Sequence, residues 1–200
     1  VVLVPLPASS DIMSAETPPY FTASGDDGTT GTLGGGRVSK FDLRIETIGA
    51  LDEANAALGL ARSLCQTEAV REAILAVQRD LYRLMAETSA GADTEKYSQS
   101  ISAETVQRLE AEVERIGSQV QMPNEFILPG DTPSAAALDL ARTVVRRAER
   151  WMAQLLASGG SQNRFLLSYL NRLSSLCFVL ELYEVRHGGR QDPTLAKNQT

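Results

Sequence analysis

The residues of this chain best suited to chemistry form a short polar stretch between residues 22 and 31. It holds glycines at a spacing of three, four hydroxyl side chains and two carboxylates, in the order Thr22, Ala23, Ser24, Gly25, Asp26, Asp27, Gly28, Thr29, Thr30 and Gly31. Glycine lets backbone N–H groups converge on an anion, hydroxyls add donors, and an aspartate can hold a Mg²⁺ that itself binds phosphate. We therefore interpret residues 22–40 as a nucleotide-phosphate loop. It lacks the Gly-Lys-Ser/Thr ending of the Walker pattern, and a flexible linker is the alternative.

A second basic group lies far downstream, on a segment with helical periodicity. Its members are spaced so that they share one edge of a helix, and they are Arg142, Arg146, Glu149 and Arg150, with Arg147 beside them. The planar guanidinium of arginine matches phosphate and carboxylate groups with two hydrogen bonds. Because the chain is acidic overall, we expect such a cluster to bind an anion or an acidic partner. A solvated helix face that is salt-bridged to neighbours, such as Asp42 or Glu46, is the alternative.

Four smaller features complete the set of residues that could carry function. Asn171 lies within a predicted helix, where asparagine is unfavourable, and it could bind a base or a ribose. Lys40 follows the polar loop and could contact phosphate, or simply point into solvent. The apolar run 126–130 is either a cover for the end of the helices or a hydrophobic wall for a large ligand. The single histidine, His187, is interpreted as a helix C-terminal cap rather than a catalyst.

Helical periodicity dominates after residue 36 and predicts the elements that must position these side chains. Five amphipathic helices are expected, at about 42–64, 68–90, 102–121, 133–158 and 162–187, with no convincing strand. Ser102 and the pair Thr132-Pro133 are typical of helix starts. We therefore predict an all-α five-helix bundle in a single domain over 22–189, with flexible tails at 1–21 and 190–200.

The composition limits the partners and the compartment. The 200 residues carry a net charge of −6, which disfavours nucleic acid and anionic membrane surfaces. No apolar run approaches the roughly 20 residues of a membrane span. The apolar start at 1–8 contains two prolines and no basic flank, so we do not interpret it as a signal peptide, and Met13 could be a translation start. Cys65 and Cys177, the only cysteines, exclude a disulfide framework and favour the cytoplasm.

Several short motifs, taken in order, resemble those of the PduO-type ATP:cob(I)alamin adenosyltransferases over about residues 21–187. The motifs are Thr22-x-x-Gly25-Asp26-x-Gly28, Arg37-Val38-Ser39-Lys40, Gly49-x-x-Asp52-Glu53-x-Asn55, Phe126-Ile127-Leu128-Pro129-Gly130, Arg146-Arg147-Ala148-Glu149-Arg150 and Asn171-Arg172-Leu173-Ser174. Each motif is modest alone. Their order and spacing on five predicted helices are highly specific.

The resemblance implies a homotrimeric enzyme with active sites between subunits and with ATP, Mg²⁺ and cobalamin as its ligands. It implies that the loop binds ATP through Thr22, Ala23, Ser24, Gly25, Asp26, Gly28, Thr30 and Gly31, with Lys40 on the phosphates. Residues of the last two helices would complete the site, and these are Arg142, Arg146, Arg147, Glu149, Arg150 and Asn171. Asp42 would pair with Arg146 across the interface, and Phe126 would fill the space below the cobalt. Mg²⁺ would be held mainly by the ATP phosphates.

The implied chemistry needs no catalytic histidine or cysteine. Cob(I)alamin is itself a strong nucleophile, and its cobalt attacks the 5′-carbon of ATP while triphosphate leaves. The protein has to supply position and charge stabilisation, which arginines, a lysine and backbone N–H groups can provide. An apolar Phe126 would keep water and the axial base away from the cobalt, which makes reduction of Co(II) easier.

The chain departs from the family pattern at several positions. Many relatives carry lysine where Ala23 and Asp27 stand, and they usually carry glycine at Asp131 and aspartate at Ser175; Phe41 replaces a commonly polar residue. Two alternatives follow. One is a non-catalytic carrier or sensor of ATP or corrinoid with the same fold. The other is a helical scaffold whose arginine edge meets an acidic partner. For an enzyme, a reductase and a B12-dependent enzyme are possible further partners.

Overall fold

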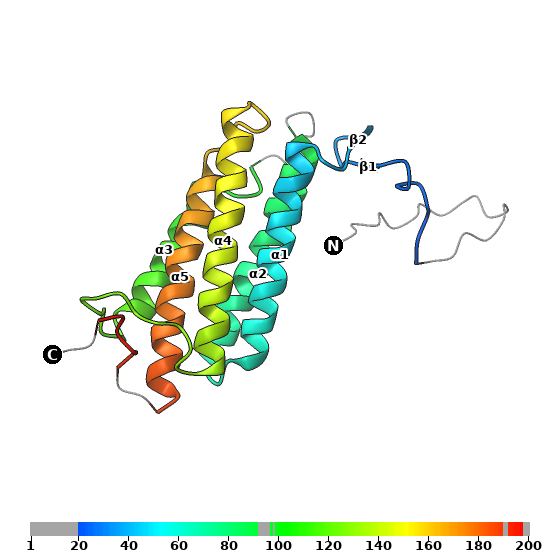
Figure 1. Cartoon of the computed structure of the whole chain (residues 1–200). Helices are drawn as coiled ribbons and strands as arrows, with labels where there is room; N and C mark the ends of the chain where they lie inside the picture. Colours follow the sequence, from blue (N-terminus) through cyan, green and yellow to red (C-terminus); the bar gives the residue numbers. More distant parts are fainter. Residues whose placement is uncertain (1–19, 92–96, 98, 190–191, 198–200) are drawn as a thin grey trace.

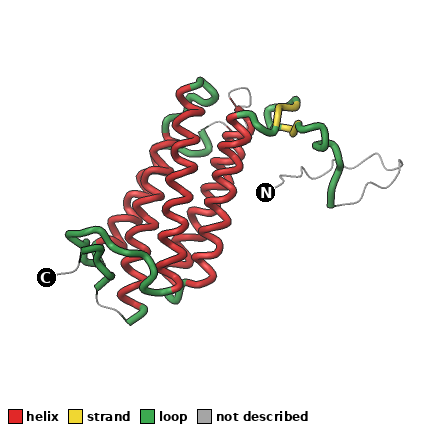
Figure 2. The backbone as a smooth tube through the Cα atoms, in the orientation of Figure 1, coloured by secondary structure: helices red, strands yellow, loops and turns green. Residues whose placement is uncertain are grey.

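A computed structural model describes residues 20–91, 97, 99–189 and 192–197. Within these residues five helices lie side by side in an elongated bundle (Figure 1 and Figure 2). They are α1 Leu43–Leu64, α2 Glu68–Ala90, α3 Ala103–Gly117, α4 Pro133–Ala157 and α5 Phe165–His187. The predicted all-α five-helix class is confirmed. The expectations about Met13 and a signal peptide lie outside the described residues.

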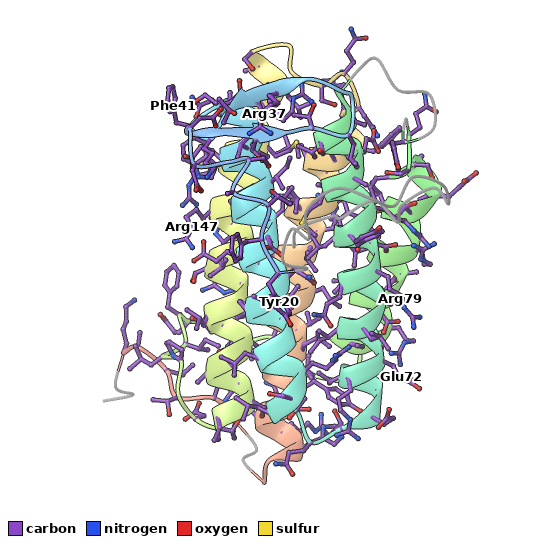
Figure 3. All side chains as sticks on the ribbon, turned by 90° about the vertical axis from the view of Figure 1, so that its right-hand side faces the viewer. Tyr20, Arg37, Phe41, Glu72, Arg79 and Arg147 are labelled. Carbon is purple, nitrogen blue, oxygen red and sulfur yellow. The ribbon has the colours of Figure 1, made fainter. Side chains whose placement is uncertain are left out.

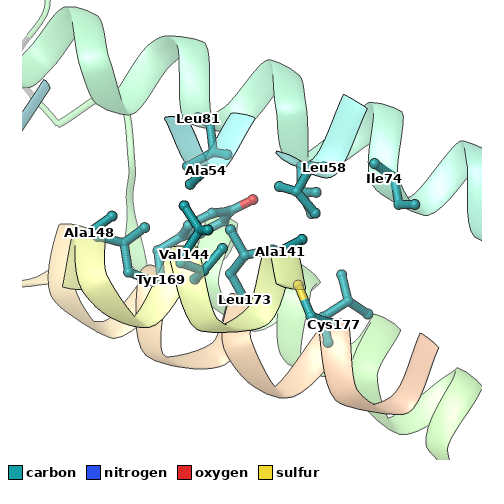
Figure 4. Packing of buried hydrophobic residues seen from close by; sticks show 14 of the residues in the cluster. Ala54, Leu58, Ile74, Leu81, Ala141, Val144, Ala148, Tyr169, Leu173 and Cys177 are labelled. Atoms are coloured by element: carbon teal, nitrogen blue, oxygen red, sulfur yellow. The ribbon is translucent and has the colours of Figure 1, made fainter. Parts of the chain in front are cut away.

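The core of the bundle is built from the apolar stripes that the periodicity predicts. α4 packs against both α1 and α5, α2 packs mainly against α1, and α3 packs against α5. Small side chains on facing helices, including Ala54, Ala141 and Ala148, are fully buried and allow α1 and α4 to approach closely. Figure 4 shows these residues around Tyr169, whose ring fills the centre of the cluster. The Tyr169 hydroxyl donates a 3.0 Å hydrogen bond to the buried carboxylate of Asp80.

The helix ends follow the predicted capping residues at two places and differ at two others. Ser102 caps α3 in a capping box with Thr105, and the Thr132 hydroxyl accepts from the N–H of Ala135 at the start of α4. α3 ends at Gly117 rather than near 121, because the next backbone bonds are of the tighter i to i+3 type. α5 begins at Phe165 rather than 162, because the Asn163 side chain accepts from the N–H of Phe165 and bonds outward to Glu87.

A small antiparallel hairpin precedes the bundle, where the sequence indicated no strand. β1 Thr29–Gly31 pairs with β2 Arg37–Ser39, with Thr30 opposite Val38. The expectation of no strand is therefore wrong at this place. The strands are only three residues long and lack the alternation of apolar and polar residues by which longer strands are predicted from sequence. The hairpin is fixed to the bundle by a 3.1 Å hydrogen bond from the N–H of Leu33 to the hydroxyl of Ser89, near the end of α2.

The chain after α5 also differs from the expected flexible tail. Residues 192–197 return to the connection between α3 and α4, and Leu195 forms an antiparallel β-bridge with Ile127. Figure 1 shows this segment beside that connection, at the end of the bundle opposite the hairpin.

Among the described helices, α5 is long and apolar enough to span a membrane by length and composition. However, 61% of its most apolar stretch is buried inside the bundle, as in a core helix.

Candidate functional site

The predicted phosphate loop is organised by Arg37 of β2. Its guanidinium donates to the Thr29 hydroxyl at 2.8 Å and to the carbonyl oxygens of Ser24 and Thr29. The Asp27 carboxylate accepts from both the N–H and the hydroxyl of Thr29, at 2.9 and 2.7 Å. These two hydrogen bonds, with the nearby Arg37 adding a smaller effect, lower the pKa of Asp27. Asp27 therefore serves the internal structure of the loop and, as a carboxylate, adds no charge that attracts phosphate.

Lys40 lies across the loop at Gly25. A Cβ atom placed on Gly25 would come within 3.2 Å of the Lys40 Nζ and 3.3 Å of the Thr29 carbonyl oxygen, so glycine leaves the room that the lysine uses. The backbone N–H of Lys40 donates to the carbonyl oxygen of Gly28 at 2.9 Å, whereas its ammonium group makes no hydrogen bond or ion pair to the residues that the structure describes and is exposed. Gly28 has a φ of +81°, which glycine adopts at little cost. The structure thus places an available ammonium group beside the glycine-rich turn.

The arginine edge of α4 is divided among different partners. Arg142 pairs with Asp139 one turn earlier, at 2.7 Å, and Arg147 pairs with Glu53 of α1. Arg150 donates to the backbone carbonyl of Arg146 at 2.8 Å. The Arg146 guanidinium itself has no hydrogen bond or ion pair to any described residue. The alternative of a solvated face paired with neighbours therefore holds for Arg142 and Arg147, although their partners are Asp139 and Glu53 rather than Asp42 or Glu46.

The last two helices are linked by the predicted residues Glu149 and Asn171. The Asn171 amide donates to Glu149 at 2.8 Å, and its carbonyl oxygen accepts from Arg172 at 2.8 Å. Arg172 in turn pairs with Glu110 of α3 at 2.7 Å. These bonds use one of the two N–H donors and one of the two oxygen lone pairs of the Asn171 amide, so a ligand can bind the exposed side chain while both bonds remain.

A cavity of about 750 Å³ lies beside the connection between α3 and α4, within the size range of small-molecule sites. Its lining combines apolar groups with cations, and it includes Phe126, Ile127, Arg142, Arg146, Ser175, Phe178 and Lys197. The Phe126 side chain is 86% exposed, so it does not cover the end of the bundle. The geometry favours the other interpretation of the apolar run, a hydrophobic wall open to a ligand.

A carboxyl group lies buried near this cavity. Glu181 of α5 is 1% exposed, and its Oε2 atom has no hydrogen-bond partner among the described residues. Burial raises the pKa of Glu181 to about 7, Asp139 adds to the rise, and Arg142 opposes it. Arg142 therefore holds one ionised carboxylate directly and stands near a second that is protonated over part of the neutral pH range.

The structure brings the predicted residues together in two groups rather than one. The hairpin group, residues 22–40, lies at the end of α4 near Ala157, whereas the connection between α3 and α4, which carries Phe126, leads into the start of α4 at Pro133 (Figure 1). A helix of 25 residues is about 37 Å long, so the groups are separated along the bundle. Figure 3 shows Arg37 and Phe41 at the hairpin end, with Arg147 farther along α4. Asp42 caps α1 by accepting from the N–H of Arg44 at 2.8 Å and has no contact with Arg146 in this chain.

Sequence reasoning missed several residues that the structure places at these two groups. Arg37 appeared only as part of a motif, although the network that it makes holds the loop. Asp139 could have been found, since it stands three residues before Arg142 on a predicted helix. Lys197 carried no sequence signal, because its place at the cavity depends on the return of the C-terminal segment.

Comparison with known proteins points to one family. The model of the family described as cobalamin adenosyltransferase matches residues 20–184. The corrinoid adenosyltransferase PduO of Salmonella typhimurium is 38% identical over 161 residues, which are 80% of this chain and 48% of that protein. The cobalamin adenosyltransferase of Cupriavidus metallidurans is 40% identical over 172 residues, 86% of this chain and 90% of that protein. The chain therefore spans about half the length of the PduO relatives that it matches and most of the length of the shorter one.

Solved structures agree with this result. A variant of the PduO-type ATP:corrinoid adenosyltransferase from Lactobacillus reuteri, complexed with cobalamin and ATP, superimposes with a TM-score of 0.81 at 31% identity. The match covers 89% of this chain and 99% of that one. A second variant of the same protein, complexed with ATP, gives a TM-score of 0.79 at 30% identity, with 88% and 99% of the two chains covered.

Proposed function

Since this chain belongs to the cobalamin adenosyltransferase family, we propose that it transfers the 5′-deoxyadenosyl group of ATP to the cobalt of cob(I)alamin. The single observation that carries the proposal is that Arg142 and Arg146 line the same open cavity as Phe126. An exposed aromatic wall suits a large, mostly apolar ring, and the adjacent guanidinium groups suit an anionic group beside it.

The reaction that we propose forms one bond and breaks another. The electron pair of Co(I) attacks C5′ of ATP, a Co–C bond forms, the C5′–O5′ bond breaks, and triphosphate takes the bonding electrons. No proton has to move at the reacting carbon, so no general base is required. The contribution of the protein is to align cobalt with C5′ and to stabilise the charge on the departing triphosphate.

On the ATP side we assign the loop from Thr22 to Gly31, with Lys40 on the phosphates. The support is geometric, since the Lys40 ammonium lies against Gly25 and has no partner among the described residues. Arg146, Arg150, Glu149 and Asn171 are proposed to complete the site from α4 and α5. Mg²⁺ is proposed to bind with ATP, because phosphate oxygens are the hard ligands that it prefers.

On the corrinoid side we assign Phe126 to the space below the cobalt. Its ring stands free at the cavity wall, where it can exclude water and the axial base. Loss of the axial ligand makes Co(II) easier to reduce, and this is how an apolar side chain contributes to a reaction that cobalt itself performs.

We propose that the enzyme is a homotrimer and that each active site is shared by two subunits. The loop and the Phe126 cavity lie toward opposite ends of one chain, so a second copy must supply the missing half. Three aromatic side chains on or beside the hairpin arm, Tyr20, Phe21 and Phe41, are 88%, 61% and 83% exposed, as expected for a surface that a neighbour covers. In this assembly Asp42 of one copy would reach Arg146 of the next. We place the protein in the cytoplasm, since both cysteines are free and buried.

The test of this function is anaerobic turnover with a matched pair of arginine variants. Protein, Mg-ATP and chemically reduced cobalamin are mixed, and the light-sensitive alkyl product and triphosphate are followed together. We expect Arg146→Ala to lower kcat by at least about 100-fold, since it removes a charge that stabilises the leaving group. Arg79→Ala, which removes an exposed arginine from α2, should leave kcat unchanged (Figure 3). Binding of both ligands by the wild type without triphosphate release would instead indicate a carrier or sensor.

A further inference from the structure

The C-terminal segment 192–197 holds the backbone of the loop that carries Phe126. The N–H of Leu128 donates to the carbonyl of Thr194 at 2.8 Å, and the N–H of Ala196 donates to the carbonyl of Phe126 at 2.7 Å. Between these bonds Ile127 and Leu195 form the β-bridge. The Phe126 ring itself is almost fully exposed, so its position depends on its backbone rather than on packing of the ring.

Asp131 fastens this segment from the other side. Its Oδ2 accepts from the N–H of Thr194 at 2.8 Å and its Oδ1 accepts from the Thr194 hydroxyl at 2.7 Å. Hydrogen bonds to an ionised carboxylate are roughly twice as strong as those between neutral groups. Lys197 adds a longer ion pair to Glu125 at 3.3 Å, and the side chains of both residues are exposed, so this ion pair contributes little to stability. Asp131 and Thr194 thus form two side-chain hydrogen bonds between the segments, both shorter than the contact between Lys197 and Glu125.

The loop needs such a link because Gly130, next to Asp131, has a φ of +124°. Glycine at such a position allows the loop several conformations, and fixing one of them costs free energy. Asp131 stands where the family pattern has a second glycine, so this chain places a carboxylate at the point where the loop would otherwise be most free.

We propose that Asp131 is a positioning residue for Phe126: by bonding Thr194 it holds residues 192–197 against the loop and so fixes where the ring stands at the cavity wall. The inference rests on the proposed function, because the position of the ring matters only if a corrinoid binds above it. The proposed role of Asp131 is exerted through the segment that it holds and not by contact with a ligand.

If Asp131 positions Phe126, the effect of removing Asp131 should depend on which group binds the lower face of the cobalt. Cob(II)alamin carries a nucleotide base that the Phe126 ring must keep away from cobalt. A corrinoid without that nucleotide, such as cob(II)inamide, has no base to exclude. Since cob(II)inamide offers only water to exclude, loosening the link should lower the base-free fraction of bound cob(II)alamin strongly and should affect the reaction of cob(II)inamide less.

The experiment compares Asp131→Ala and Thr194→Val with the control Asp192→Ala. Asp192 lies in the same segment and is exposed, with no hydrogen bond or ion pair to the residues that the structure describes. With Mg-ATP and excess protein, the optical and electron paramagnetic resonance spectra of Co(II) report the ratio of base-free to base-bound corrinoid. We expect this ratio to fall about fivefold or more in Asp131→Ala, to fall less in Thr194→Val, and to be unchanged in Asp192→Ala.

Three outcomes would overturn the inference, and each is distinct from failure of the proposed function. A wild-type ratio in Asp131→Ala would show that the link does not position the ring. Equal losses with cob(II)inamide, or a lower ATP affinity, would indicate a general structural role. If Asp131→Ala does not fold, Thr194→Val decides, because it removes one hydroxyl and keeps the side-chain volume. Absence of any adenosylated product from the wild type would instead reject the proposed function.

Discussion

Phe126 offers a direct test of the chemistry at the scale of a single residue. If its ring excludes the axial base, Phe126→Ala should slow the reaction that starts from Co(II) by about 100-fold. The reaction that starts from pre-reduced Co(I) should slow much less, because it does not include the reduction step that the axial base hinders. The two rates can be compared anaerobically in one protein preparation. Equal losses in the two reactions would contradict the role below the cobalt.

Glu181 predicts how stability depends on pH. Its pKa lies near 7 in the folded chain against an ordinary 4.5, because burial disfavours the ionised form and Asp139 repels it. The folded state therefore binds the proton more tightly than the unfolded state, and stability should fall as pH rises from about 4.5 to about 7.

Glu181→Gln removes the group that ionises. At pH 8 the variant should be more stable than the wild type by at most about 3 kcal/mol in urea unfolding, and at pH 4.5 the two should be close. A difference between the two proteins that does not change over this pH range would contradict the assignment.

Some of the residues that the sequence singled out line the cavity beside Phe126, but the partners of these residues could not be predicted. Periodicity aligned Arg142 and Arg146 on one edge, and both line the cavity. That Arg147 turns to Glu53 of α1 could not be read, because it depends on how α1 and α4 are rotated against each other. The role of Arg37 as the organiser of the loop was likewise hidden, since the hairpin that brings it to Ser24 and Thr29 was not predicted.

At the scale of elements, α2 begins with a cap that comes from another helix. Thr67 makes no side-chain capping bond of its own, and the buried carboxylate of Glu184 on α5 accepts from the N–H groups of Gln66 and Thr67 and from the Thr67 hydroxyl. An ionised group at a helix N-terminus satisfies backbone donors that would otherwise lose water. This contact ties the α1–α2 turn to α5.

Removal of that cap should destabilise the bundle. Glu184→Ala leaves the part-buried N–H donors of Gln66 and Thr67 without their carboxylate partner and is expected to lower the free energy of unfolding by about 1–3 kcal/mol. Glu114→Ala, at an exposed position of α3, should change it by less than about 0.5 kcal/mol. Chemical denaturation of both variants measures the difference, and similar values for the two would argue against a structural role for Glu184.

The long helices could be predicted from the sequence, whereas the short strands and the exact helix ends could not. Each long helix repeats its apolar stripe several times, so the class and number of helices followed from periodicity. The end of α3 and the start of α5 did not, because the chain after Gly117 changes to local i to i+3 bonds and because Asn163 bonds to the distant Glu87. The C-terminal pairing at 192–197 was missed for the same reason, since its partner lies in another part of the chain.

At the scale of the whole molecule, one chain holds the two proposed halves of the active site toward opposite ends of the bundle. The hairpin carries the proposed phosphate ligands, and the cavity beside Phe126 carries the proposed corrinoid wall. No sequence pattern states how many copies assemble, so the separation of the halves became visible only with the fold. A head-to-tail ring, in which the hairpin of each copy reaches the cavity of the next, joins every half to its complement.

Co-expression of two inactive variants tests this shared site most directly. Lys40→Ala damages only the hairpin half and Arg146→Ala only the helical half, and each alone should lose at least about 100-fold in activity. In a randomly mixed assembly about one site in four joins an intact hairpin to an intact helical half, so the mixture should recover about a quarter of wild-type activity. Activity in the mixture no higher than that of the two parents would contradict an active site built between subunits.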